Sequence, residues 1–126
     1  MGQAEFYSLA TESEKNAVKA LMTQYPRLSK TLKELAARQL LTQREQQVKE
    51  SIERKVENIE MAVRLIQDDE VRAITEYRFI KNHTRQQTLM RWNRVTDRTV
   101  DRYINAGIES VANTLKLIGQ VDETCL

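Results

Sequence analysis

The hydrophobic residues of this chain recur every three or four positions, which is the period of α-helices that bury one face. The most regular series alternates spacings of four and three, with charged and amide side chains between its members. It consists of Ile52, Val56, Ile59, Val63 and Ile66. Such an apolar seam predicts a helix that packs against a partner helix. The seam is therefore the candidate partner interface of this chain.

Two helices are expected before the seam. Thr11 to Glu14 has the Thr-x-x-Glu form of a capping box and is followed by helical periodicity, which predicts a helix over residues 12–24. Tyr25-Pro26 is expected to end this helix, because the residue before a proline is disfavoured in the helical conformation. A second helix is expected from Leu28 to Leu41.

The connection to the seam helix and the partner of the seam both have alternatives. Thr42 to Glu45 has the form of a second capping box, which indicates either a break near residue 42 or a shift of register in one long helix. The preceding helix can fold back on the seam as an antiparallel hairpin, or the seams of two chains can pair in a homodimer. Only about two heptads are regular, and so short a coiled coil is marginal in isolation.

An acidic run at residues 68–70 marks the start of a further helix, because acidic side chains stabilise the positive end of a helix dipole. This helix is expected over residues 69–81, with Asn82-His83 at its end. Its periodicity predicts which residues face inward. They are Val71, Ile74, Tyr77 (or Arg78) and Ile80.

A short helix and a turn come next. Thr84 to Gln87 is a third capping-box sequence, so a helix is expected to begin there. Its expected apolar positions are Leu89, Met90 and Trp92. Residues 92–95 form the turn, and Thr96-Asp97 is expected to cap the last helix.

The last helix has the longest apolar stripe of the chain. The stripe consists of Val100, Tyr103 with Ile104, Gly107 with Ile108, Val111, Leu115 and Ile118. Gly119 is expected as the C-terminal cap. A glycine inside a helix costs about 1 kcal/mol relative to alanine. Gly107 therefore predicts a bend in this helix or the close approach of another backbone.

Composition and length agree with an all-α fold. The chain has 126 residues with three glycines and one proline, which suits one helical domain with an extension. We expect an N-terminal helical hairpin or extension over residues 1–67 and a C-terminal helix-turn-helix unit with a long recognition helix over 68–119. Residues 120–126 are expected to be a flexible tail.

Positive charge is concentrated in the C-terminal half. Between Arg72 and Lys116 there are nine Lys or Arg residues and four acidic residues, although the whole chain has a net charge of only +2. A local excess of five positive charges favours binding to a nucleic acid. The order of a short helix, a four-residue turn and a long amphipathic helix is typical of a helix-turn-helix that binds double-stranded DNA.

The candidate DNA-binding residues follow from the roles that this motif needs. In the first turns of the recognition helix, Arg can bind guanine, Asn can bind adenine and Thr can contact the methyl group of thymine. The candidates there are Arg98, Thr99, Arg102 and Asn105. Phosphate contacts are expected from Thr84, Arg85, Gln86 and Gln87 at the start of the short helix, and from the flanking Arg91 and Arg94. Asp97 and Asp101 oppose binding, and Asp97 is best explained as a cap.

These segments resemble a known family. Ile74-Thr-Glu-Tyr-Arg-Phe-Ile80, Thr84-Arg-Gln-Gln87, Val95-Thr-Asp-Arg-Thr-Val100 and Gly107-Ile108 are similar to the DNA-binding region 4 of sigma factors. They are still more similar to RinA/ArpU-type regulators of phage late genes, which join such a module to an N-terminal helical segment. The resemblance implies a sequence-specific transcriptional regulator of phage late genes, with DNA and RNA polymerase as partners.

The chain departs from the family pattern at three places. Thr88-Leu89 stands where the pattern has a small residue, the turn is one residue longer, and Gly107 replaces an alanine. The aromatic residues of this region are interpreted as core rather than as a platform for stacking bases. They are Tyr77, Phe79, Trp92 and Tyr103.

Enzymatic chemistry has little support in this sequence. The single histidine, His83, is interpreted as a loop residue, and it forms neither a nucleophile–base pair nor a metal cluster with the single cysteine, Cys125. We expect no enzyme activity, no cofactor and no metal. Cys125 has no partner for a disulfide, and neither a membrane span of about 20 apolar residues nor a signal peptide is evident. A cytoplasmic protein that does not bind membranes is expected.

Two other functions remain compatible with the sequence. One is a helical adaptor or inhibitor that binds another protein through its N-terminal helices. The other is a DNA-recognition subunit of a phage packaging motor, which would form a ring.

Overall fold

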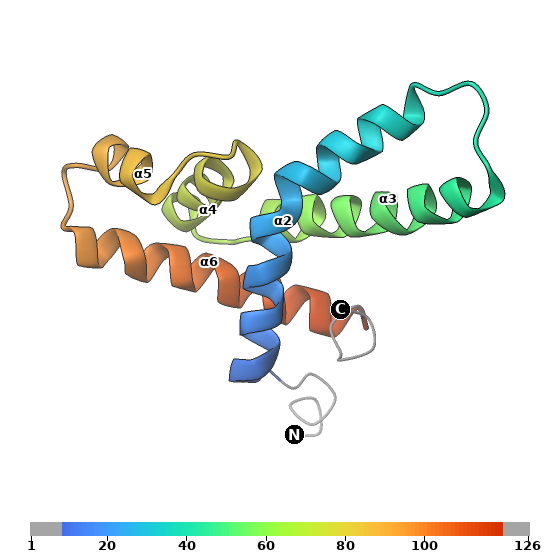
Figure 1. The fold of residues 1–126 in the computed structure, drawn as a ribbon. Coiled ribbons are helices and arrows are strands. Elements are labelled where there is room, and N and C mark those ends of the chain that lie inside the picture. Colours follow the sequence, from blue (N-terminus) through green and yellow to red (C-terminus); the bar gives the residue numbers. More distant parts are fainter. Residues whose placement is uncertain (1–8, 120–126) are drawn as a thin grey trace, which may run out of the picture.

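The computed structural model describes residues 9–119, and over that range the chain contains helices and no strand (Figure 1). This confirms the predicted all-α fold class. The elements are α2 (Glu12–Ala36), α3 (Gln43–Arg64), α4 (Asp69–Thr75), the π-helical segment η1 (Glu76–Ile80), α5 (Arg85–Arg91) and α6 (Asp97–Leu117). The tail expected over residues 120–126 lies outside the described residues.

Helix α2 continues through Pro26, so the predicted end of the helix at Tyr25 is wrong. Its start is as predicted, because Thr11 and Glu14 form a complete capping box. The proline removes a backbone N–H and crowds the carbonyl four residues earlier, and Figure 1 shows that the helix axis changes direction near its middle. Burial compensates for the lost hydrogen bond, because Met22 and Tyr25 lie in the core and the Tyr25 hydroxyl donates to the Glu60 carboxylate.

Helices α2 and α3 pack against each other as an antiparallel hairpin (Figure 1). Thr42 caps α3 with a capping box, so the chain breaks between Ala36 and Gln43 and does not continue as one helix. The apolar seam faces the chain's own core. Val56, Ile59, Val63 and Ile66 are buried there, and Ile52 is half-buried. The expected partner interface is therefore not an exposed surface, because intramolecular packing covers it.

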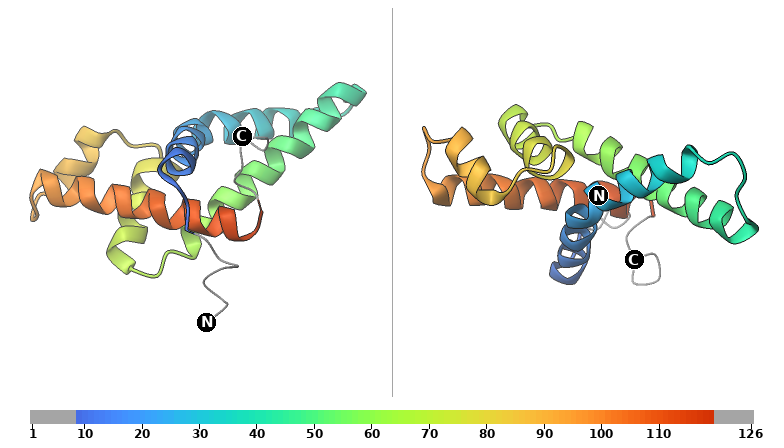
Figure 2. Two further views of the ribbon diagram at one scale, coloured as in Figure 1. Left: turned by 90° about the horizontal axis from the view of Figure 1, so that it is seen from below. Right: turned by 45° about the horizontal axis from the view of Figure 1, so that its top comes forward.

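The core is continuous across the boundary expected between residues 67 and 68. One cluster of buried side chains joins Met22 of α2, Ile59 of α3, Ile74 of α4 and Leu115 of α6. Helix α6 is the element that connects the two halves, since it packs against α2, α3, α4 and α5 (Figure 2). The N-terminal and C-terminal segments therefore form one packed unit.

The helix predicted over residues 69–81 is divided into α4 and η1. In η1 the Lys81 N–H donates to the Glu76 carbonyl at 2.9 Å, a bond that spans five residues. The additional residue in this turn shifts the buried register. Phe79 enters the core as a result, whereas Tyr77 and Ile80, which were expected to face inward, are only half-buried.

Gly107 lies where α4 and α6 approach each other. A methyl group built on it would overlap the Thr75 Oγ1 atom. The Thr75 hydroxyl is held in place because it donates to the Val71 carbonyl at 2.7 Å, and Thr75 is fully buried. The close approach expected at Gly107 is thus made mainly by a side chain, and α6 continues through the glycine. Gly119 follows α6 with a φ of 78°, as expected for a C-terminal cap.

Candidate nucleic-acid interface

Two capped helices, α5 and α6, are joined by a short connection at the left in Figure 1, where the N-terminal end of α6 lies. Thr84 caps α5, where the Thr84 N–H donates to Gln87 Oε1 at 2.8 Å and the Gln87 N–H donates to Thr84 Oγ1 at 3.1 Å. Thr96 caps α6, and its hydroxyl accepts from the Thr99 N–H at 3.1 Å. Both caps were predicted and are confirmed. They could be predicted from the sequence because each cap joins groups only three residues apart.

Helix α6 carries a polar stripe along its exposed side, which we call the outer stripe. Its members are three or four residues apart and therefore lie on one face. They are Arg98, Arg102, Asn105, Glu109, Asn113 and Lys116. The opposite face is buried and includes Val100, Ile104, Ile108 and Val111. Three of the predicted DNA-binding residues thus lie together on the outer stripe.

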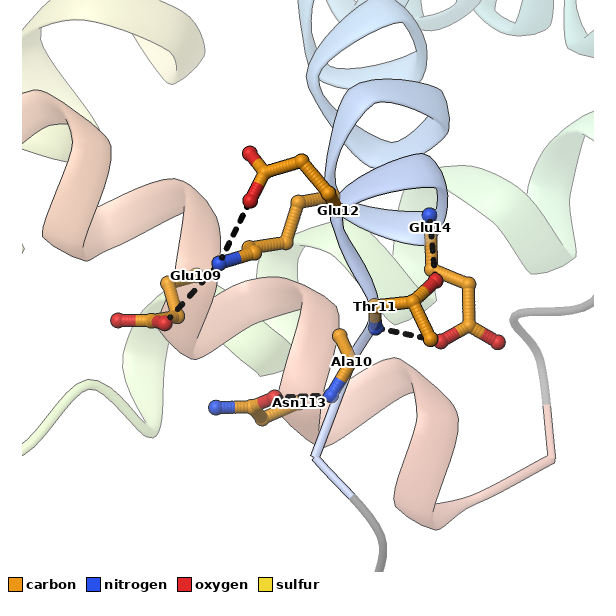
Figure 3. A network of polar contacts seen from close by, with 7 residues as sticks. Ala10, Thr11, Glu12, Glu14, Glu109 and Asn113 are labelled. Carbon is orange, nitrogen blue, oxygen red and sulfur yellow. Dashed lines mark hydrogen bonds and ion pairs between the residues drawn. The ribbon is translucent and has the colours of Figure 1, made fainter.

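The C-terminal half of the outer stripe holds the first turns of α2 (Figure 3). The Ala10 N–H donates to Asn113 Oδ1 at 2.8 Å, and Lys15 Nζ lies 3.3 Å from Glu109 Oε2. The interaction with Glu109 raises the pKa of Lys15 above its usual value. Sequence reasoning missed this contact, because its partners are about a hundred positions apart in the chain.

Lys116 completes the contact between α6 and α2. Its Nζ atom lies 2.8 Å from Glu14 Oε1 and donates to the Leu9 carbonyl at 3.1 Å. The hydrogen bond from Lys116 lowers the pKa of Glu14 below its usual value, and the capping contact with Thr11 adds to this effect. The charges in this half of the outer stripe are therefore satisfied within the chain.

The N-terminal half of the outer stripe has no such partners. Arg98, Arg102 and Asn105 are exposed, and within residues 9–119 none of the ion pairs involves either arginine. This half therefore presents two guanidinium groups and an amide to solvent. Such groups match the hydrogen-bonding edges of guanine and adenine and the oxygens of phosphate.

Arg85 is bound to an acidic residue of α6 rather than directed to solvent alone. Its Nε and Nη2 atoms donate to the two carboxylate oxygens of Asp101 at 2.9 and 2.8 Å. This contact lowers the pKa of Asp101 and raises that of Arg85. The pair neutralises one of the two acidic residues that oppose DNA binding, and it links α5 to α6. Arg85 is accordingly less available for a phosphate than the sequence suggested.

The other predicted residues of α5 and of the α6 cap have different surroundings. Thr84 and Gln87 are exposed but occupied in the α5 capping box. Gln86 is exposed. Thr99 is half-buried, and its hydroxyl lies 2.9 Å from the Thr96 hydroxyl. Thr99 thus supports the cap of α6 instead of joining the outer stripe.

Arg91 and Arg94 line a groove beside the α5–α6 connection. The groove has a volume of about 730 Å³ and is lined by Glu70, Arg91, Trp92, Arg94, Val95 and Tyr103. Trp92 and Tyr103 are half-buried, and the Trp92 indole N–H donates to the Glu70 carboxylate. The two arginines were predicted to contact flanking phosphates, and both are exposed near the N-terminal end of α6; the phosphate contacts stay a prediction.

An aromatic cluster next to this groove was missed by the sequence interpretation. The rings of Tyr77 and His83 are stacked with centroids 3.7 Å apart, and Trp92 meets Tyr77 edge to face at 5.4 Å. The Arg91 guanidinium lies 5.4 Å from the Tyr77 ring centroid. Of the four aromatic residues expected in the core, only Phe79 is buried. His83 is in a loop as expected, but it is half-buried and packed rather than solvated.

The packing of α5 also differs from its predicted pattern. Met90, expected as an apolar core position, is 71% exposed, whereas Thr88 is fully buried. The Thr88 hydroxyl donates to the Thr84 carbonyl at 2.8 Å, so its polar group is satisfied inside the helix. Thr88 therefore occupies the buried side of α5, which the sequence pattern had assigned in part to Met90.

Within residues 9–119, no group of three or more His, Cys, Asp or Glu side chains is arranged to hold a metal ion. None of the helices in the same range is both long and apolar enough to cross a membrane. Comparisons of the chain with protein-family models, with curated proteins and with solved structures find no match.

Proposed function

We propose that this chain is a sequence-specific transcriptional regulator that binds double-stranded DNA with the N-terminal half of the outer stripe. The observation that carries the proposal is the group formed by Arg98, Arg102 and Asn105. These side chains share one face of a capped helix, and all three are exposed. On this proposal α5 and α6 act as a helix-turn-helix, with α6 as the recognition helix.

The length of the exposed segment supports this mode of binding. Residues 97–105 precede the crossing of α2 and span about 13 Å at the rise of an α-helix. The major groove of B-DNA is about 12 Å wide and admits one α-helix. The first turns of α6 are thus long enough to cross the groove before α2 obstructs further entry.

The resemblance to RinA/ArpU-type regulators extends the proposal to a target and a partner. It suggests promoter DNA of phage late genes and RNA polymerase, with the protein acting in the cytoplasm. The packing of the core bears on the homodimer that the seam also allowed. A homodimer formed through the seam of residues 52–66 requires side chains that the chain's own core already covers, so the DNA-binding unit proposed here is a single chain.

A titration followed by fluorescence anisotropy tests the proposal. A labelled duplex of random sequence is titrated with the intact protein at about 50 and about 200 mM salt, since phosphate contacts make affinity fall as salt rises. The affinity falls as salt rises, so the slope of log K against log salt is negative. Replacing both Arg98 and Arg102 by alanine is expected to make this slope less steep by about two, one for each lost phosphate contact.

A matched variant controls for the loss of charge. Arg54 and Arg64 are exposed on α3, and replacing both by alanine removes the same charge away from the outer stripe. This variant is expected to keep the wild-type slope. The proposal fails if the wild-type protein does not bind DNA at low salt, or if the two double variants have the same slope.

A protein adaptor is the second candidate function, and one observation favours it. The tip of the α2–α3 hairpin exposes apolar side chains, since Leu40 is 89% exposed and Val48 is 40% exposed. Exposed apolar residues at a projecting tip are suited to a protein contact. The same titration separates the two candidates, because an adaptor would show no salt-dependent binding to the duplex.

A further inference from the structure

Helix α2 crosses the outer stripe of α6 directly after Asn105. Two shallow grooves lie beside this crossing, with volumes of about 410 and 340 Å³. Both grooves are lined by Lys19 of α2 and Asn105 of α6, although each has other residues of its own. Lys19 and Asn105 thus lie together where the exposed half of the outer stripe ends.

The charge of Lys19 is not used within the described part of the chain. Its neighbour one turn earlier, Lys15, is paired with Glu12 and Glu109, whereas none of the ion pairs within residues 9–119 involves Lys19. Lys19 is exposed, so its ammonium group remains accessible to an anion.

Other cations border the same two grooves. Arg102 lines one of them together with Lys19, and Arg78 and Arg85 line the other. Asp101 neutralises Arg85, but Lys19 and Arg102 have no such partner. A cation on α2 and a cation on α6 therefore flank the crossing. The two carboxylates that line the same groove, Glu12 and Glu109, are both paired with Lys15.

The dimensions of the duplex place a phosphate strand near this position. The major groove is bounded by two sugar–phosphate strands about 12 Å apart, and the exposed segment of α6 is about 13 Å long. When the N-terminal end of α6 lies near one strand, the other strand passes close to the α2 crossing. Lys19 then faces the strand that borders the far side of the groove.

We propose that Lys19 binds a phosphate of the duplex that receives α6, so that α2 is a third DNA-binding element. The inference rests on the proposed function and extends it, because it assigns a contact to the N-terminal segment. A phosphate contact carries no base information. Lys19 therefore adds affinity for every sequence, while discrimination among sequences depends on base contacts such as the one expected from Asn105.

The test compares two single substitutions in the same helix. Lys19→Ala is expected to weaken binding about three- to tenfold at moderate salt and to make the salt dependence of log K less steep by about one. Both changes are expected to be the same for every duplex sequence. Lys30→Ala is the control, since Lys30 is also exposed on α2 but lies after Pro26 and lines neither groove. Thermal unfolding followed by circular dichroism verifies that both variants fold like the wild-type protein.

The outcomes separate this inference from the proposed function. If the wild-type protein does not bind DNA, the proposed function fails and the role of Lys19 fails with it. If the wild-type protein binds and the Arg98 and Arg102 double variant lowers the slope, but Lys19→Ala behaves like Lys30→Ala, only the inference about Lys19 is overturned. A loss confined to some sequences would also contradict it, because a phosphate contact acts on all of them.

Discussion

The two halves of the outer stripe of α6 share a helix, a spacing and a polar composition, yet they differ in what they contact. Residues 109–116 bind the start of α2 through two ion pairs and hydrogen bonds. Residues 98–105 extend beyond α2 and carry two arginines that form no ion pair within the described residues. The first set stabilises the fold, and the second is available for a ligand.

This difference shows why a polar helix face is not by itself a binding face. Periodicity assigns Arg102 and Glu109 to the same side of α6, but only the packing of α2 determines that Glu109 pairs with Lys15 while Arg102 forms no ion pair within the described residues. Three kinds of substitution test the comparison. One changes the glycine between the two halves, one replaces the same residue type in each half, and one removes a charge next to the N-terminal half.

Gly107 offers the largest disturbance, because it lies on α6 between the two halves and packs against Thr75. Gly107→Ala is expected to lower the free energy of unfolding by about 1–3 kcal/mol, since the new methyl group overlaps a buried side chain that is already hydrogen-bonded. This loss outweighs the gain of about 1 kcal/mol that alanine gives inside a helix. Urea unfolding measures the change.

A double variant shows whether the overlap is the cause. Thr75→Ala removes the hydroxyl that the methyl group would meet, so adding it to Gly107→Ala is expected to recover part of the stability lost by the single change. Thr75→Ala alone provides the reference. A Gly107→Ala variant that is more stable than the wild-type protein would show that helix propensity dominates and that the contact with Thr75 yields easily.

The accuracy of the sequence predictions depended on the distance between interacting residues. Thr11, Thr84 and Thr96 were predicted as caps, and for Thr42 a cap at a helix break was one of two alternatives. All four are caps, and each has its partner three residues away. The end of α2 at Tyr25 was wrong, because packing against α3 outweighs the local preference imposed by Pro26. Tyr77 and Ile80 were expected to face inward but are only half-buried, because the π-helical turn changes the register from that of a regular α-helix.

The candidate site followed the same rule. The exposed positions of Arg98, Arg102 and Asn105 agree with helical periodicity, which is a local property. The pairing of Arg85 with Asp101 and the position of Lys19 beside Asn105 depend on how separate helices meet. No short-range pattern contains that information. The DNA-binding role of all these residues stays a prediction.

Asn105 and Asn113 allow the same substitution in each half, because they are the same residue type on the same stripe. Asn105→Ala is expected to reduce discrimination between DNA sequences by about 1–3 kcal/mol, the value of one good base contact, with little change in stability. Asn113→Ala is expected to lower the free energy of unfolding by about 1 kcal/mol, because it removes the acceptor of the half-buried Ala10 N–H. Anisotropy with a panel of duplexes and urea unfolding measure the two effects.

The pair serves as its own control, since each variant is measured in both assays. The comparison holds if Asn105→Ala alters DNA binding but not stability, and Asn113→Ala alters stability but not DNA binding. Equal effects of the two variants in both assays would show that the halves of the outer stripe do not have separate roles.

Asp101 gives the smallest expected effect, because its charge is already paired. Asp101→Asn removes a negative charge beside the proposed phosphate path and weakens the hold on Arg85, whose two donors now bind both carboxylate oxygens. Affinity for a random duplex is therefore expected to rise about two- to threefold at moderate salt. The pair is about half-exposed, so the cost in stability is small.

Glu57→Gln on α3 is the matched control, because Glu57 is exposed and distant in sequence from the candidate site. It also removes one negative charge, and it is expected to leave the affinity nearly unchanged. The contact with Arg85 lowers the pKa of Asp101, so Asp101 stays ionised in the wild-type protein on mild acidification, and only the substitution removes its charge. Weaker binding by Asp101→Asn would mean that Asp101 holds Arg85 in the orientation that DNA requires, and it would reverse the role assigned to this pair.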